Sequence, residues 1–193
     1  GKADVVLAIG TRLQDFTTGS WTVFDPDFKL VSINAARFDT VKHGSVAVVG
    51  DAKVCLEEMD ALIGSYKAGD AWKAYAKERM DDWRAYRDER GKVTNQNPVS
   101  YAQAVTAVSK QSGPKDRMIA AAGGLPGELN MLWQSKGLAS FDCEYGYSCM
   151  GYELAGGWGA AMALEERDAG SDDKGETFVM VGDGSYLMAN SDI

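Results

Sequence analysis

Apolar and polar residues alternate along residues 1–64 in the order typical of a parallel α/β unit. Three short apolar runs are expected to form buried strands joined by loops: 4–9, 28–34 and 46–51. A helix is expected after the third run, between an N-cap at Asp51 and a stop at Gly64. Its apolar residues recur at helical intervals: Val54, Leu56, Met59, Leu62 and Ile63. The segment therefore reads as the tail of an α/β unit.

The pattern changes abruptly at residues 69–90, which are rich in charged residues and helix formers. We expect one long, solvent-facing helix here, with a stripe of apolar side chains that docks on neighbouring domains. The stripe contains Trp72, Tyr75, Met80, Trp83 and Tyr86. The polar segment 91–100 that follows resembles a linker, and Pro98 stands where the next helix is expected to start. We therefore predict a helical linker at 65–97.

Residues 98–193 repeat the alternation of helical and strand patterns. Helices are expected at 98–111, from Pro126 and Gly127 onward, and at 151–167. Strands are expected at 117–124, 138–144 and 177–184. A polar surface loop is expected at 168–176. This order indicates a second parallel sheet, so the predicted fold class is α/β, with two partial three-layer α/β/α units.

Composition narrows the classes of partner and compartment. A net charge of −8 argues against nucleic acid, because phosphate binding usually needs a basic face. The sequence has no run of eighteen apolar residues and no secretory signal, so we expect neither a membrane span nor export. Three widely spaced cysteines without a CxxC motif favour a reduced, cytoplasmic protein. The chain also begins without Met and enters a strand almost at once, which suggests a piece of a longer protein.

Three expected strand ends in the second unit are followed by glycine-containing turns. They are "AAGGLPGEL" from Ala121, "DCEYGYSCMGYELAGG" from Asp142 and "GDGSY" from Gly182. Ligands of open α/β sheets bind beyond the carboxyl ends of the strands, and glycines let backbone amides approach a phosphate. An aspartate at a strand tip supplies one oxygen ligand for a hard cation. Together the three turns predict a site for a phosphorylated ligand and its Mg²⁺, whereas a lone Gly-Asp-Gly is by default a tight turn.

Four further residues have a structural and a functional interpretation. Met150 alone is more often core filler than a cofactor contact. Cys149 has no histidine near it in sequence, so a nucleophilic role is disfavoured. For Glu144, a solvated turn is favoured over a general acid. His43 is the only histidine and is expected to be structural, which also excludes a multi-histidine metal site.

At this point the motifs resemble a known family. The stretch "GYSCMGYELAGGWGAAMA", a polar loop and then "FVMVGDGSYLM" resemble the cofactor domain of thiamine-diphosphate-dependent enzymes. The stretch "ADVVLAIGTRLQDFTTGSW", with "FKLVSINAARFD" and "VVGDAK", is similar to the second half of the central domain in acetolactate-synthase-like members. The resemblance thus implies the C-terminal half of a central domain at 1–64 and a truncated diphosphate-binding domain at 98–193.

Within that family, "FDCEYGYSCMGYE" and "NPVSYAQAV" resemble the members that act in myo-inositol degradation. Those members hydrolyse the C–C bond of the cyclic diketone 3D-(3,5/4)-trihydroxycyclohexane-1,2-dione to give 5-deoxy-D-glucuronate, without flavin. The resemblance implies thiamine diphosphate and Mg²⁺ as cofactors, a small cyclic polyol diketone as substrate, and a homodimer or homotetramer. An acetolactate-synthase-like carboligase, a 2-oxo acid decarboxylase and a non-catalytic α/β interaction module remain alternatives.

The resemblance also implies roles for individual residues. Asp183 corresponds to a Mg²⁺ ligand whose metal bridges the cofactor's diphosphate. Met150 corresponds to the apolar residue that enforces the cofactor's bent shape, and the Ser148 carbonyl to the acceptor for its pyrimidine amino group. Backbone contacts are implied for Gly124, Leu125, Gly127, Cys149, Gly182, Gly184 and Ser185, the last also through its hydroxyl.

Two parts of the family's site have no counterpart in this sequence. The asparagine that closes the Gly-Asp-Gly motif would fall after Ile193, and the activating glutamate belongs to an N-terminal pyrimidine-binding domain. We therefore expect no catalytic residue in this chain and no activity from it alone.

Overall fold

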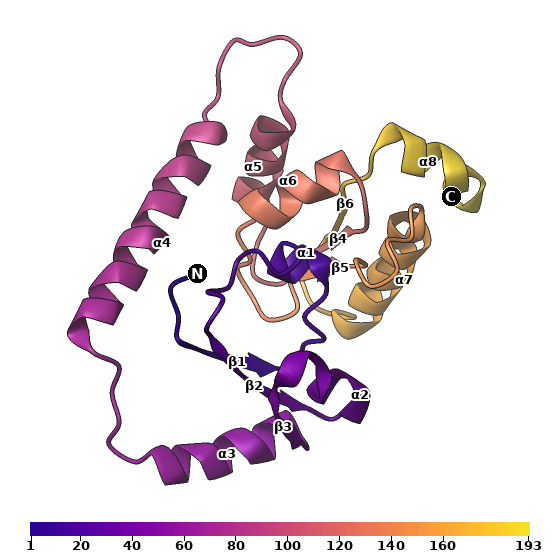
Figure 1. Cartoon of the computed structure of the whole chain (residues 1–193). Coiled ribbons are helices and arrows are strands. Elements are labelled where there is room, and N and C mark those ends of the chain that lie inside the picture. Colours follow the sequence, from indigo (N-terminus) through magenta and orange to yellow (C-terminus); the bar gives the residue numbers. More distant parts are fainter. The chain divides into compact units, whose positions relative to one another are not determined.

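A computed structural model describes residues 1–193, apart from the side chain of Asp192. The chain forms two compact units, Gly1–Gly69 and Asp70–Ile193, each of which is described by itself (Figure 1). Each contains a three-stranded sheet with parallel strands, flanked by helices, which confirms the predicted α/β class. The division at residues 64 and 97 stays a prediction.

The sheet of the first unit has the order β1-β2-β3. Its strands are β1 (Val5–Ile9), β2 (Lys29–Asn34) and β3 (Val46–Val49). The central strand β2 pairs with both neighbours, Val31 lying opposite Leu7 on one side and Val46 on the other. Leu30 and Ile33 of β2 are buried, as the apolar pattern predicts for a central parallel strand.

The helices of the first unit are α1 (Asp15–Thr18), α2 (Arg37–Thr40), the 3₁₀ turn η1 (Lys42–Gly44) and α3 (Ala52–Ile63). The caps predicted for α3 are confirmed: the Asp51 carboxylate accepts the N–H of Val54 at 3.1 Å, and Gly64 ends the helix with φ +58°. The short helices α1 and α2 correct the expectation of plain loops. Four-residue helices are too short to leave a periodic pattern in the sequence.

His43 lies in an aromatic cluster, as its expected structural role requires. Its ring centroid is 3.8 Å from that of Trp21, which also contacts Phe24 and Phe28. His43 has φ +59°, a backbone conformation uncommon for residues other than glycine. The cluster therefore accounts for the chain's only histidine.

The sheet of the second unit has the order β5-β4-β6. Its strands are β4 (Arg117–Ala120), β5 (Phe141–Cys143) and β6 (Thr177–Val179). In the central strand β4, Met118 pairs with Phe141 of β5 and with Phe178 of β6. All three strands are shorter than predicted: β4 and β6 end before the glycines that follow them, and β5 begins only at Phe141.

The helices of the second unit are α4 (Asp70–Arg90), α5 (Tyr101–Gln111), α6 (Gly124–Leu132), α7 (Tyr152–Arg167), α8 (Asp183–Ala189) and the 3₁₀ turn η2 (Asn190–Asp192). Two expected helix starts and one expected strand end need correction. Helix α5 begins at Tyr101, not at Pro98, and its N-cap Ser100 forms a capping box with Gln103. Helix α6 begins at Gly124, so Pro126 lies in its first turn. The predicted strand 177–184 ends at Val179, so Asp183 is the first residue of α8.

The core of the second unit lies between the sheet and helices α5 and α6. Met118 and Ala120 of β4 are fully buried there with Val105 of α5 and Leu129 of α6. Ile119 points to the other face, where it lines a cavity with residues of α7. The unit therefore has three layers, with α5 and α6 on one face of the sheet and α7 on the other.

Helix α7 approaches β6 very closely. Gly157 of α7 is buried, and a Cβ at this position would lie 2.3 Å from Cγ2 of Val179. Helix α4, in contrast, buries none of its residues, and Trp72, Met80, Trp83 and Tyr86 of the predicted stripe are exposed. Its last residue, Arg90, forms an ion pair with Glu128 of α6 at 2.5 Å.

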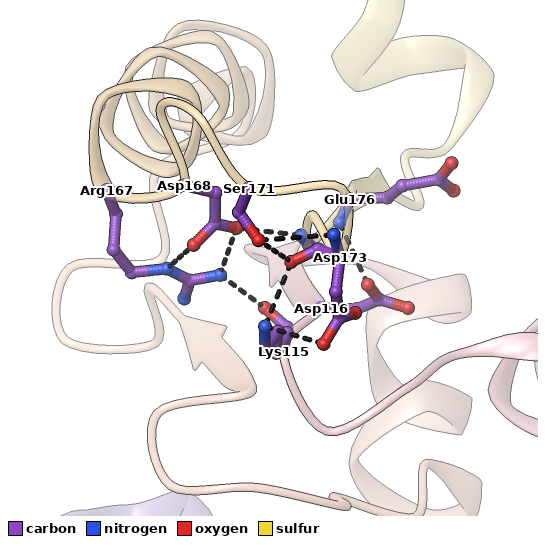
Figure 2. A network of polar contacts seen from close by, with 8 residues as sticks. Lys115, Asp116, Arg167, Asp168, Ser171, Asp173 and Glu176 are labelled. Atoms are coloured by element: carbon purple, nitrogen blue, oxygen red, sulfur yellow. Dashed lines mark hydrogen bonds and ion pairs between the residues drawn. The ribbon is translucent and has the colours of Figure 1, made fainter.

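A polar network fastens the end of α7 to the sheet (Figure 2). Arg167 donates to both oxygens of Asp168, from Nε and from Nη2, at 2.6 Å each. Asp168 also accepts the N–H of Gly175 at 2.8 Å. The Arg167 guanidinium and this backbone donor hold the pKa of the Asp168 carboxyl well below its usual range. The carboxylate thus joins both ends of the loop 168–176.

The same network reaches the segment before β4 (Figure 2). Asp116 accepts the N–H of Glu176 at 2.8 Å, and Lys115 pairs with the Asp173 carboxylate at 2.7 Å. The residues that make these contacts precede β4 or β6 in the chain, so the contacts lie at the amino ends of these strands. The polar loop expected at 168–176 is therefore held in place at the edge opposite the glycine-containing turns.

No helix in the part of the chain that the structure describes has the length and apolar character to cross a membrane.

Candidate functional site

The three glycine-containing turns lie at one edge of the second sheet. Strands β4, β5 and β6 are parallel neighbours, so their carboxyl ends point the same way. The turn after β4 leads into α6, the turn after β5 leads into α7, and the turn after β6 leads into α8. The fold thus brings together segments 121–127, 144–151 and 180–185, as the strand-end pattern predicts.

The first turn offers backbone donors at the start of α6. The N–H groups of a helix's first turn have no partner within the helix. Here these groups belong to Gly124 and Leu125, because Pro126 has no N–H and Gly127 donates to the carbonyl of Gly123 at 3.0 Å. Gly127 contributes space, since nothing lies within 4 Å of a Cβ placed there.

The second turn exposes the loop residues that sequence reasoning singled out. Met150 is 47% exposed, so it is not core filler in the described part of the chain. Ser148 has φ +59°, and the exposed Cys149 follows it. Desolvation and the neighbouring Glu144 charge raise the pKa of the Cys149 thiol, which keeps it protonated at neutral pH. This protonation argues against a nucleophilic role for Cys149.

Glu144 organises this loop through its carboxylate. Its oxygens accept the N–H groups of Tyr147 at 2.7 Å and of Cys149 at 2.8 Å. These backbone donors, first Cys149 and then Tyr147, lower the pKa of the Glu144 carboxyl. A carboxylate stabilised in its ionised form is poorly suited to general acid catalysis, so the structure agrees with the turn role.

The third turn carries the Gly-Asp-Gly motif. Asp183 and Gly184 are exposed at the start of α8, while Ser185 is buried. Nothing lies within 4 Å of a Cβ placed at Gly182 or Gly184. The two glycines that flank Asp183 in the chain therefore leave open space beside it.

The residues present fit a diphosphate group with a hard divalent cation. The first turns of α6 and α8 have unpaired N–H groups, which attract anions, and the open glycines leave room for phosphate oxygens. Among the described residues, no three His, Cys, Asp or Glu side chains gather as a metal cluster. Asp183 is thus a single carboxylate, as suits a cation that takes further oxygens from phosphate and water.

Sequence reasoning missed Glu153, a fully buried acid in the first turn of α7. Its Oε2 accepts the N–H of Gly151 at 2.9 Å, whereas its Oε1 has no partner among the described residues. The signal was present, because an acidic residue two positions after a glycine N-cap, in the first turn, is typical of a helix start. With Glu144, it places a carboxylate at either end of the exposed loop.

Comparisons with known proteins agree with this geometry. The model of the thiamine pyrophosphate enzyme central domain matches residues 1–59. The model of the C-terminal thiamine pyrophosphate binding domain of the same enzymes matches residues 121–193. The second match includes all three turns at the carboxyl edge of the sheet.

Similar curated proteins are 3D-(3,5/4)-trihydroxycyclohexane-1,2-dione hydrolases. The one from Clostridium botulinum (strain Alaska E43 / Type E3) is 36% identical over 215 residues, covering 99% of this chain and 32% of the relative. The one from Listeria innocua serovar 6a is 35% identical, covering 100% of this chain and 33% of the relative. The one from Bacillus velezensis is 36% identical over the same shares. The chain spans about a third of the length of these relatives. Its two matched domains show that it belongs to the thiamine pyrophosphate enzyme family.

Proposed function

We propose that the protein carrying this chain is a thiamine-diphosphate- and Mg²⁺-dependent hydrolase of inositol degradation. Its substrate would be 3D-(3,5/4)-trihydroxycyclohexane-1,2-dione and its product 5-deoxy-D-glucuronate. The observation that carries the cofactor proposal is the meeting of three glycine-containing turns at one sheet edge, with Asp183 exposed among them. The substrate proposal rests on the names of relatives that are 35–36% identical over almost the whole chain.

Residues of the three turns bind different parts of the cofactor and its metal ion. Asp183 binds Mg²⁺, while Gly182 and Gly184 leave room for the diphosphate. The first-turn N–H groups of Gly124 and Leu125 donate to phosphate oxygens, and those of Gly184 and Ser185 do the same from α8. The donors among these groups belong to the backbone, so their positions are set by the starts of α6 and α8.

The loop after β5 orients the organic part of the cofactor. Met150, exposed next to the start of α7, would offer an apolar surface to the organic part of the cofactor. The Ser148 carbonyl is the acceptor for its amino group, and Cys149 flanks both. When bound, thiamine diphosphate supplies the nucleophilic carbon and the electron sink that C–C cleavage requires.

A product assay on the full-length protein tests this proposal. Supplied with thiamine diphosphate and Mg²⁺, the protein is expected to convert the cyclic diketone to 5-deoxy-D-glucuronate, observed by NMR. Conversion of pyruvate to acetolactate, or release of CO₂ from a 2-oxo acid, without ring opening would instead assign it to a carboligase or a decarboxylase. Absence of thiamine diphosphate binding in calorimetry would overturn the cofactor proposal itself.

A further inference from the structure

The loop between β5 and α7 is tied to the sheet at its first residue. The N–H of Glu144 donates to the carbonyl of Ala120 at 3.0 Å. Ala120 is the last residue of the central strand β4 and is fully buried. Glu144 is therefore bonded to the buried central strand of the unit, while residues 146–150 after it are exposed.

From this fixed point the Glu144 side chain reaches forward along the loop. Its Oε1 accepts the N–H of Tyr147 at 2.7 Å, and its Oε2 accepts the N–H of Cys149 at 2.8 Å. Both oxygens of one carboxylate are thus bonded to backbone groups three and five residues later. Hydrogen bonds to an ionised acceptor are shorter and stronger than those between neutral groups.

Ser148 lies between the two residues that donate to Glu144. Its φ of +59° is unfavourable for a residue with a side chain, so the surrounding contacts must maintain it. Its carbonyl accepts no hydrogen bond from the described part of the chain. The N–H groups on its two sides point to Glu144, and this arrangement leaves the carbonyl open to a ligand.

The far end of the loop is fastened in the same manner. The N–H of Gly151 donates to the buried Glu153 carboxylate at 2.9 Å. Alternate N–H groups, at residues 147, 149 and 151, are therefore all bonded to carboxylates. Met150 lies in the chain between two of these bonded residues, Cys149 and Gly151.

We propose that Glu144 is a positioning residue for the cofactor loop, whose carboxylate holds the Ser148 carbonyl and Met150 in the orientation that binds and activates the cofactor. This inference rests on the proposed function. Glu144 touches neither the cofactor nor the substrate in this role, and acts only through the backbone of the loop. Its lowered pKa, caused by the Cys149 and Tyr147 donors, keeps the acceptor charged at neutral pH.

The test is Glu144→Gln in the full-length enzyme, because glutamine has the same shape but only one acceptor oxygen. Glu165→Gln is the matched control, since Glu165 is exposed on α7 and undergoes the same charge change. The readout is exchange of the thiazolium C2 proton for deuterium at saturating thiamine diphosphate. For Glu144→Gln we expect exchange to slow by about tenfold, as for the loss of one charge-assisted hydrogen bond, in a variant that is still folded at the assay temperature. Glu165→Gln should match the wild type.

Exchange in Glu144→Gln at the wild-type rate would overturn the positioning role while leaving the proposed function intact. If the wild-type enzyme binds no thiamine diphosphate, the proposed function itself fails. A second measurement does not depend on the variant folding: amide hydrogen exchange of the cofactor-free wild type. We expect the Tyr147 and Cys149 amides to be protected before the cofactor binds. Rapid exchange of both, at the rate of an open loop, would equally overturn the role of Glu144.

Discussion

Gly157 of α7 lies directly against Val179 of β6. A Cβ at Gly157 would lie 2.3 Å from Cγ2 of Val179, well inside van der Waals contact. The helix can approach the strand this closely only because the residue has no side chain. This contact fixes the distance between α7 and the sheet, and with it the position of the loop that α7 follows.

Gly157→Ala is therefore expected to destabilise the second unit. The added methyl group must displace the Val179 side chain, the helix or the strand, which costs about 1–3 kcal/mol in the free energy of unfolding. Gly159→Ala is the control, because nothing lies within 4 Å of a Cβ there and alanine favours the helix by up to about 1 kcal/mol. Denaturant unfolding of the full-length protein measures both. Equal stability of the two variants would contradict the close packing.

Asp168→Asn should make the folding stability of the protein less dependent on pH in the acidic range. Arg167 and the Gly175 N–H lower the pKa of Asp168 in the folded state. Its contribution is therefore fully present above the unfolded-state pKa of about 3.9 and is lost as pH falls through the folded-state value. The melting temperature of Asp168→Asn should lie below that of the wild type at neutral pH, and the difference should shrink below about pH 4.

Asp172→Asn, in the same loop and exposed, is the control for the change in net charge. Thermal unfolding between neutral and acidic pH compares the three proteins. A gap between Asp168→Asn and the wild type that stays constant with pH would show that the carboxylate does not act through its ionised form.

Ser100→Ala should weaken the start of α5. The Ser100 hydroxyl accepts the N–H of Gln103 at 3.3 Å, and the Gln103 side chain accepts the N–H of Ser100 at 3.2 Å. Loss of such a cap costs about 1 kcal/mol. Ser135→Ala is the control, because Ser135 is exposed in the loop after α6. The denaturant midpoint of unfolding should fall for Ser100→Ala and not for Ser135→Ala. Equal midpoints for the two variants would show that the cap does not contribute to stability.

The sequence predicted the sheets and the edge at which the turns meet, for a physical reason. Parallel strands are often continuous apolar runs, as in Val5–Ile9 and in Met118–Ala120, which is buried, and their carboxyl ends must lie together. The caps at Asp51 and Gly64 were equally readable, because each residue satisfies a local backbone requirement. These features depend on short segments alone.

The parts that were wrong or missed depend on contacts that a local pattern does not contain. Helix α6 begins two residues before Pro126 because the chain leaves the sheet at Ala120, and Gly123 makes the turn with φ +133°. The hydrogen bonds from Tyr147 and Cys149 to Glu144 arise from the conformation of the whole loop. A single acidic residue in a sequence does not reveal such contacts.

Asp183→Ala tests the metal ligand of the proposed cofactor site. Asp183 is exposed at the start of α8, so its loss should change stability little, by about 0.3–1 kcal/mol through the helix dipole. Binding of Mg²⁺ should be lost, because the described residues form no cluster of His, Cys, Asp or Glu side chains that could take over from Asp183. We expect the full-length variant to lose turnover and to regain none in excess Mg²⁺.

Paramagnetic resonance with Mn²⁺ as a probe measures the metal separately from turnover. The exposed Asp172→Ala in the loop 168–176 is the control, since it removes the same charge far from the Gly-Asp-Gly turn along the chain. That control should bind Mn²⁺ as the wild type does, while Asp183→Ala should not. Turnover like that of the wild type in Asp183→Ala would exclude Asp183 as the metal ligand, because a cation held by a single protein carboxylate at this edge cannot be retained without it.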